Sequence, residues 1–158
     1  MDLTFKTPEG RFNHRVAGLL MQEGRVLIMM DQRSPYYYLP GGRVALHETS
    51  GEAIVRELRE ELHTEVTVQR LCYVAESYFI EEVSGERFHE VCFYYQLEPS
   101  EELLSRGTEF YSEEGQKRHF FRWASVSELQ DLYFQPVFLK DRLQRLPEQT
   151  EHLVIREY

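Results

Sequence analysis

One capped amphipathic helix, set between strand-like segments, constrains the fold most. Thr49 and Glu52 have the Thr-x-x-Glu spacing of a capping box, which marks the first turn of a helix. The apolar residues that recur after it at helical spacing are Ile54, Val55, Leu58 and Leu62. At about 100° per residue they lie within roughly 60° of Leu58, so they form one buried stripe. The helix is therefore expected to pack this stripe against the rest of the domain.

Strand-like runs surround this helix. The expected strands are 14–21, 25–30, 36–39, 43–46, 66–80, 88–97, 117–124 and an edge strand at 152–155, with a hairpin turn at 83–86. The acidic segment 98–116 is expected to be a loop with at most one helical turn. A second capping box at Ser125 and Glu128, then Pro136 before 137–146, predict two further helices. Many strands with few helices predict an α/β layered fold, and the length predicts a single domain over 1–158.

Composition and charge exclude several classes of protein. No apolar run approaches the roughly 18 to 20 residues of a membrane span, and the N-terminus lacks the pattern of a secretion signal. Cys72 and Cys92 lie in apolar runs, which predicts buried free thiols and a cytoplasmic protein. The formal net charge of -9 argues against binding to long nucleic acids. It leaves a phosphate-bearing substrate open, because a divalent cation inverts the sign of an acidic site.

Three carboxylates crowd one side of the helix. Relative to Leu58, Glu57, Glu61 and Glu60 project at roughly -100°, -60° and -160°, so they share an arc of about 100°. Such crowding is destabilising unless cations neutralise it, and oxygen ligands suit Mg²⁺ or Mn²⁺. Arg56 lies four residues before Glu60 and is expected to orient it. A helix taken alone would more often present such residues as a solvated face.

The joint pattern of these residues resembles the Nudix box, Gly-x5-Glu-x7-Arg-Glu-U-x-Glu-Glu-x-Gly-U, where U is a bulky aliphatic residue. Gly42 is followed after five residues by Glu48, and after seven more by Arg56-Glu57-Leu58-Arg59-Glu60-Glu61. The flanking strands and the segment 123–129 are also similar to the family. The sequence departs from the box at its end, where His63 and Thr64 replace the glycine and the aliphatic residue. We expect His63 to alter the helix end and not to act as a ligand.

The resemblance implies an α/β/α sandwich with a mixed, curved sheet and a metal-dependent hydrolase of pyrophosphate bonds in nucleoside diphosphate derivatives or nucleoside triphosphates. It implies Mg²⁺ as cofactor, with Mn²⁺ as a substitute. The metal ligands implied are Glu57, Glu60, Glu61 and the carbonyl group of Gly42. The catalytic residues implied are Arg56, Glu60 and Glu61, and the substrate-binding residues expected are Arg33, Tyr38, Gly41 and Gly42.

Several alternatives stay open at this point. The general base is Glu60, Glu61 or a carboxylate of the acidic segment, which contains Glu101, Glu102, Glu109, Glu113 and Glu114. His14 and Arg15 are further candidates for phosphate contacts. The substrate within the nucleotide class and a homodimeric assembly are both undecided. The rival function is a Nudix module that has lost turnover and binds a nucleotide in a regulatory role, and His63 is the main feature in its favour.

Overall fold

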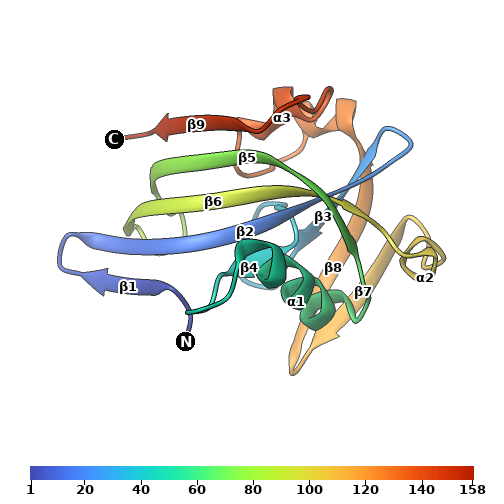
Figure 1. Cartoon of the computed structure of the whole chain (residues 1–158), viewed down its shortest axis with the longest axis horizontal. Helices are drawn as coiled ribbons and strands as arrows, with labels where there is room; N and C mark the ends of the chain where they lie inside the picture. Colours follow the sequence, from blue (N-terminus) through green and yellow to red (C-terminus); the bar gives the residue numbers. More distant parts are fainter.

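The computed structural model describes residues 1–158 and contains a nine-stranded mixed sheet with short helices around it (Figure 1). The strands are β1 (Thr4–Thr7), β2 (Gly10–Gln22), β3 (Arg25–Met30), β4 (Gly41–Arg43), β5 (Thr67–Ile80), β6 (Arg87–Glu98), β7 (Glu109–Glu114), β8 (Lys117–Ser125) and β9 (Glu151–Arg156). The helices are α1 (Ser50–Leu62), α2 (Glu101–Leu104), the 3-10 helix η1 (Val126–Asp131) and α3 (Leu139–Arg142). None of them combines the length and the apolar character that crossing a membrane requires.

The sheet is mixed and divides into two arms. Its strand order is β7-β8-β3-β2-β6-β5-β9, with β1 and β4 also paired to β2. The β2·β6 and β5·β9 pairs are parallel and the other strand pairs are antiparallel. Strand β3 pairs with β2 only at Met21 and Gln22, next to the turn that joins the two strands. The arm formed by β3, β8 and β7 therefore diverges from the long strands β2, β6 and β5, and α1 lies where the arms separate (Figure 1).

Alternate residues of β2 face two separate hydrophobic cores, as the period of two in a strand requires. Val16 and Leu20 pack with the apolar stripe of α1, and Trp123 joins the same core. Ala17 and Leu19 face the other side of the sheet, where η1 and α3 contribute apolar side chains. Helices thus cover both faces of a mixed, curved sheet, and the prediction of an α/β/α fold is confirmed. The two cysteines are free and buried, as predicted.

The long central hairpin of β5 and β6 and the edge strand β9 are confirmed. In the segment 98–116 the expected helical turn is present as α2, but the expectation that the rest is a loop is wrong. This segment contains α2 and the strand β7, which pairs with β8 along its whole length. Its inward residues Phe110 and Ser112 alternate with exposed neighbours, and Phe110 stacks on Phe121 with ring centroids 5.4 Å apart. Because the segment is rich in acidic residues, its composition indicated a loop, although buried and exposed residues alternate along it as in a strand.

Other boundaries also differ from expectation. The strand β1 was not expected, and β2 begins at Gly10 instead of residue 14. The expected strand 36–39 makes only isolated bridges, and the expected strand 43–46 is replaced by β4. The second capping box opens a 3-10 helix, and the helix expected over 137–146 shortens to α3. Phe138, the residue before this helix, makes no side-chain capping hydrogen bond. The helix therefore lacks the stabilisation that a polar N-cap residue provides.

Candidate active site

Both ends of α1 are fixed by local contacts, and this sets the direction in which its carboxylates project. The capping box is formed: Glu52 N–H donates to Thr49 Oγ1 at 3.1 Å, and Thr49 N–H donates to the Glu52 carboxylate at 3.0 Å. At the other end, His63 adopts a left-handed conformation with φ 52°, the conformation that glycine favours at this place. The helix therefore ends at the point where the Nudix box specifies glycine, even though the residue is histidine.

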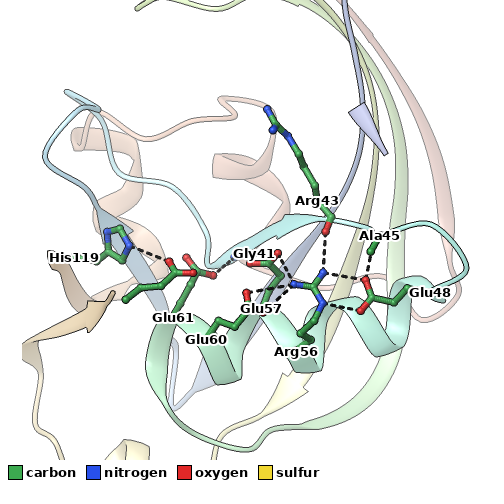
Figure 2. Close-up of polar contacts among 10 residues, drawn as sticks. Gly41, Arg43, Ala45, Glu48, Arg56, Glu57, Glu60, Glu61 and His119 are labelled. Carbon is green, nitrogen blue, oxygen red and sulfur yellow. Dashed lines mark hydrogen bonds and ion pairs between the residues drawn. The ribbon is translucent and has the colours of Figure 1, made fainter. Parts of the chain in front are cut away.

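The three clustered carboxylates of α1 differ in how much water reaches them. Glu61 is buried at 5% exposure, the Glu57 side chain is 14% exposed and that of Glu60 is 46% exposed. Glu61 accepts a hydrogen bond from the Gly41 N–H at 3.0 Å, so β4 holds it at the junction of the two arms (Figure 2). A Cβ atom on Gly42 would overlap the carboxylate of Glu57. Gly42 therefore lets β4 approach the helix closely, whereas a Cβ atom on Gly41 would overlap the backbone of Val16 in β2.

Arg56 is the centre of an ion-pair network, but Glu60 is not its main partner. Its guanidinium makes a bidentate pair with Glu48 at 2.7 and 2.9 Å, and Nη2 also donates to the Arg43 carbonyl oxygen at 3.0 Å (Figure 2). Its Nη1 lies 3.0 Å from Glu57 Oε1 and 3.3 Å from Glu60 Oε2. The contact to Glu60 expected from the sequence is present. The main effect of Arg56 is to fasten the loop before the helix to the helix itself.

Electrostatic repulsion is concentrated at Glu57 and Glu61. Burial raises the pKa of Glu57 to about 7, the nearby negative charges of Glu60 and Glu114 add to the rise, and Arg56 opposes it. Burial also raises the pKa of Glu61 well above its usual value, and the charges of Glu57 and Glu114 act in the same direction. By contrast, the hydrogen bonds from Arg56 lower the pKa of Glu48. The site therefore holds negative charge that its own cations do not fully compensate.

Glu114 is the member of the acidic segment that the fold brings to the carboxylate cluster. Ser112, on the same inward face of β7, donates from Oγ to the backbone oxygen of Glu61 at 2.8 Å and so joins the strand to α1. The inward Glu114 side chain approaches His119 of β8 at 3.4 Å. The other four candidates for the base point outward or lie on α2, namely Glu101, Glu102, Glu109 and Glu113. Sequence reasoning could name Glu114 only as one of five, because the pairing of β7 with β8 was not expected.

The expected substrate-binding residues lie in different surroundings. Tyr38 donates from its hydroxyl to Asp31 at 2.6 Å, and burial together with this hydrogen bond raises its pKa. Arg33 lies on the exposed part of the loop between β3 and β4. Arg15 of β2 carries a positive charge near the site: burial alone would lower its pKa, yet the charges of Glu90 and Glu61 contribute to a net rise. In the sequence, Arg15 was only a further candidate for a phosphate contact.

The residues that depart from the Nudix box have structural roles. The ring of His63 contacts the backbone oxygen of Glu113, away from the carboxylates. Thr64 is buried, and its hydroxyl lies 2.6 Å from that of Ser100. The first contact joins the end of α1 to β7, and the second joins it to the start of α2. Neither residue is placed to act as a ligand at the carboxylate cluster.

The carboxylates suit a divalent cation, although no three acidic, histidine or cysteine side chains form a ready-made coordination group. The donor set at the cluster consists of oxygen atoms, which hard cations such as Mg²⁺ prefer. Burial and the neighbouring negative charges raise the pKa of Glu57 and Glu61, and positive charge between the two carboxylates would relieve their repulsion. The residues present therefore fit such an ion.

The site thus consists of a capped helix with clustered carboxylates at the junction of a divided mixed sheet. A family model described as NUDIX domain matches residues 12–144. The chain therefore belongs to the Nudix family, and the prediction of a Nudix pyrophosphohydrolase is confirmed at the level of the enzyme class. Comparison with curated protein sequences gives no match.

Solved structures with the same fold are distant in sequence. A NUDIX hydrolase from Nitrosomonas europaea aligns with a TM-score of 0.61 and 18% identity over 92% of this chain and 79% of that chain. A UDP-X diphosphatase aligns with a TM-score of 0.62 and 15% identity over 94% and 68%. An ADP-ribose pyrophosphatase from Streptococcus suis aligns with a TM-score of 0.57 and 19% identity over 90% and 98%. At these identities the similarity establishes the fold.

Proposed function

We propose that this protein hydrolyses a pyrophosphate bond in a nucleoside diphosphate derivative or a nucleoside triphosphate, with Mg²⁺ as its cofactor and Mn²⁺ as a substitute. The observation that carries the proposal is the buried pair Glu57 and Glu61, whose raised pKa values reflect burial and carboxylate crowding. The names of two structural neighbours, a UDP-X diphosphatase and an ADP-ribose pyrophosphatase, support the substrate class.

The roles of the helix residues follow from their exposure and contacts. Glu57 and Glu61 are the proposed metal ligands, with the Gly42 carbonyl group beside them. Glu60 is half exposed and provides a further ligand or a contact through water. Arg56 keeps the helix and the Glu48 loop together and limits the movement of the Glu57 and Glu60 carboxylates. When bound, Mg²⁺ supplies positive charge that neutralises the pyrophosphate oxygens and makes a nearby water molecule more acidic.

The substrate is bound by cationic and aromatic groups around the cluster. We assign Arg15 to a phosphate group, because its charge lies among the negative charges of Glu90 and Glu61 and forms no ion pair within 4.0 Å. Arg33 and Tyr38, with Gly41 and Gly42 of β4, complete the proposed binding surface. Tyr36 packs against Tyr38 and Tyr133, with ring centroids 6.2 and 5.7 Å away, and offers an aromatic face to a nucleobase.

Hydrolysis needs a proton acceptor for the attacking water, and we assign this role to Glu114. Glu57 and Glu61 serve the cation in this proposal and Glu60 is a further ligand or a contact through water, so Glu114, whose charge acts on both Glu57 and Glu61, is the remaining carboxylate. The water oxygen forms a bond to one phosphorus while its proton passes to Glu114. The bridging P–O bond breaks, and its electron pair leaves with the departing phosphate group.

The rival function, a nucleotide-binding module without turnover, loses its main support. It rested on His63 in place of glycine, and α1 nevertheless ends in the left-handed conformation at that residue. The carboxylates Glu57, Glu60 and Glu61 keep their places on one side of the helix (Figure 2).

A substrate panel tests the proposal. The protein is incubated with ADP-ribose, UDP-glucose or dGTP in Mg²⁺ or in excess EDTA, and the mononucleotide products are separated by anion-exchange chromatography. We expect Mg²⁺-dependent formation of AMP, UMP or dGMP from at least one of them. Tight nucleotide binding without product in any reaction would favour the regulatory module instead.

A further inference from the structure

The inner face of the β7–β8 hairpin carries a polar pair that the Nudix box does not contain. Because side chains alternate along a strand, Ser112 and Glu114 of β7 share a face with His119 of β8, and Ser112 lies directly opposite His119. Glu114 Oε1 lies 3.4 Å from Nε2 of His119. Figure 2 shows the imidazole of His119 directed toward the Glu61 side of the cluster.

Glu114 needs a group that holds it in this place. Its negative charge repels those of Glu57 and Glu61, and repulsion of this kind favours a side-chain conformation turned out to water. The Glu114 side chain is 34% exposed, so such a movement is sterically open to it. His119 is the hydrogen-bond partner of its carboxylate.

The burial of His119 favours one tautomer of its ring, in which the nitrogen that faces Glu114 carries the proton. The side chain is 7% exposed, and its Nδ1 atom is buried without a hydrogen-bond partner. Buried N–H groups without an acceptor are rarer than buried acceptors without a donor. The tautomer that fits this environment has an unprotonated Nδ1 and an Nε2–H that donates to Glu114. The imidazole lies beside Phe121, with ring centroids 6.5 Å apart.

We propose that His119 is a positioning residue of the hydrolytic site, whose Nε2–H holds the Glu114 carboxylate toward the cluster so that Glu114 can accept the proton of the attacking water. The inference rests on the proposed function and adds to it a residue outside the Nudix box. His119 itself contacts neither substrate nor cation in this account. It acts through Glu114, whose position decides whether the proton acceptor lies within hydrogen-bond reach of the water.

Kinetics of matched variants test the role of His119. The variants are His119→Leu, which removes the donor, His119→Gln, which offers an amide donor, Glu114→Ala, and the double variant Glu114→Ala/His119→Leu. With Mg²⁺ and the panel nucleotide that the wild type cleaves fastest, we expect His119→Leu to lower kcat about 10-fold with little change in KM. His119→Gln should restore most of this loss, and His119→Leu should have little further effect once Glu114 is removed.

Phe121→Leu is the control for lost packing. Phe121 is buried beside His119, and its side chain has no polar group that could hydrogen-bond to Glu114. We expect it to lower the melting temperature while keeping kcat near that of the wild type. A wild-type kcat in His119→Leu would overturn the inference. Independent, multiplicative losses in the double variant would also overturn it, because they would show that His119 does not act through Glu114.

A measurement without substrate separates this inference from the proposed function. The ¹⁵N shifts of the His119 ring, recorded on the labelled protein by long-range ¹H–¹⁵N NMR, are expected to show the Nε2–H tautomer and to change in Glu114→Ala. An Nδ1–H tautomer, or shifts that are insensitive to Glu114→Ala, would overturn the contact even in an active enzyme. Absence of turnover by the wild type on the whole panel would instead overturn the proposed function, and the catalytic role of Glu114 with it.

Discussion

At the scale of single residues, Glu57 links the stability of the protein to pH. Its pKa is raised from 4.5 to about 7 in the folded protein, mainly because it is buried. The folded state therefore binds more protons than the unfolded state between these values, so the free energy of unfolding falls as pH rises from about 4.5 to about 7. The contribution is fully present below the unfolded pKa and is lost above the folded pKa.

Thermal unfolding of the metal-free protein at several pH values checks this prediction. Glu57→Gln should flatten the decrease in melting temperature between pH 5 and pH 8, since the amide carries no charge at either pH. Glu98→Gln, at the exposed end of β6, is the matched control and should leave the decrease in place. An identical pH dependence in Glu57→Gln and wild type would contradict the raised pKa.

Arg15 provides a second test at this scale. Arg15→Gln should raise KM about 10-fold or more, because a charged hydrogen bond to a phosphate contributes about 1.5–3 kcal/mol. We expect a smaller change in kcat than in KM, because Arg15 is proposed to bind the substrate and not to transfer a proton. Steady-state kinetics with the best panel nucleotide measure both constants. Arg25→Gln at the exposed start of β3 is the control, and equal KM values for the two variants would argue against a phosphate contact by Arg15.

At the scale of elements, the close approach of β4 to α1 depends on Gly42. A methyl group there would overlap the Glu57 carboxylate, so Gly42→Ala should displace this proposed ligand. We expect the affinity for Mg²⁺, measured by isothermal titration calorimetry, to fall about 10-fold or more. Gly51→Ala is the control within α1, because the nearest atom to its added Cβ would be Tyr95 Oη at 3.9 Å. Unchanged Mg²⁺ affinity in Gly42→Ala would place the cation elsewhere.

The end of α1 yields a prediction about stability alone. His63 has φ 52°, where a Cβ atom is unfavourable by about 1 kcal/mol relative to glycine. His63→Ala keeps this strain and loses the contact to Glu113, whereas His63→Gly relieves the strain. Urea denaturation should therefore find His63→Gly more stable than His63→Ala by about 1 kcal/mol. The reverse order would mean that the helix end rearranges when the imidazole is removed.

Elements that carry local signals were predictable from the sequence. The start of α1 is set by side chains three residues apart, and its buried face by apolar residues at helical spacing, so both could be inferred before the structure was available. The strand β7 was missed because half of its residues are exposed and three of the six are glutamates, and its pairing with β8 is what makes it a strand. The short helices η1 and α3 depend on tertiary packing against the sheet more than on their own sequence signals.

At the scale of the whole molecule, the site combines residues of α1, which the sequence predicts, with a residue of β7, which the sequence does not predict. Glu57, Glu60 and Glu61 share one helix, so helical geometry alone predicts that they lie together. Glu114 reaches them only because β7 pairs with β8 and Ser112 joins that hairpin to the end of α1. Contacts between residues about 50 positions apart, such as that of Ser112 with Glu61, leave no periodic signal in one sequence, which is why Glu114 could not be singled out from the other carboxylates of its segment.

The acidic residues of the chain have different surroundings in different parts of the molecule. Several of its 27 acidic residues form surface pairs, such as Glu65 with Arg59 and Glu102 with Arg106. Exposed pairs of this kind contribute little to stability. Glu57, Glu61 and Glu114 instead meet where the two arms of the sheet separate, and their mutual repulsion is the physical reason to expect a cation between them and an anionic substrate.

The most direct test of this account is the Mg²⁺-dependent rate of hydrolysis by Glu61→Gln and by wild type on the same panel nucleotide. The substitution keeps the size of the side chain and removes a proposed metal ligand. Loss of several kcal/mol of charge stabilisation predicts a fall in kcat/KM of about 100-fold or more. Equal values of kcat/KM for Glu61→Gln and wild type would contradict the assignment of the carboxylate cluster as the metal site.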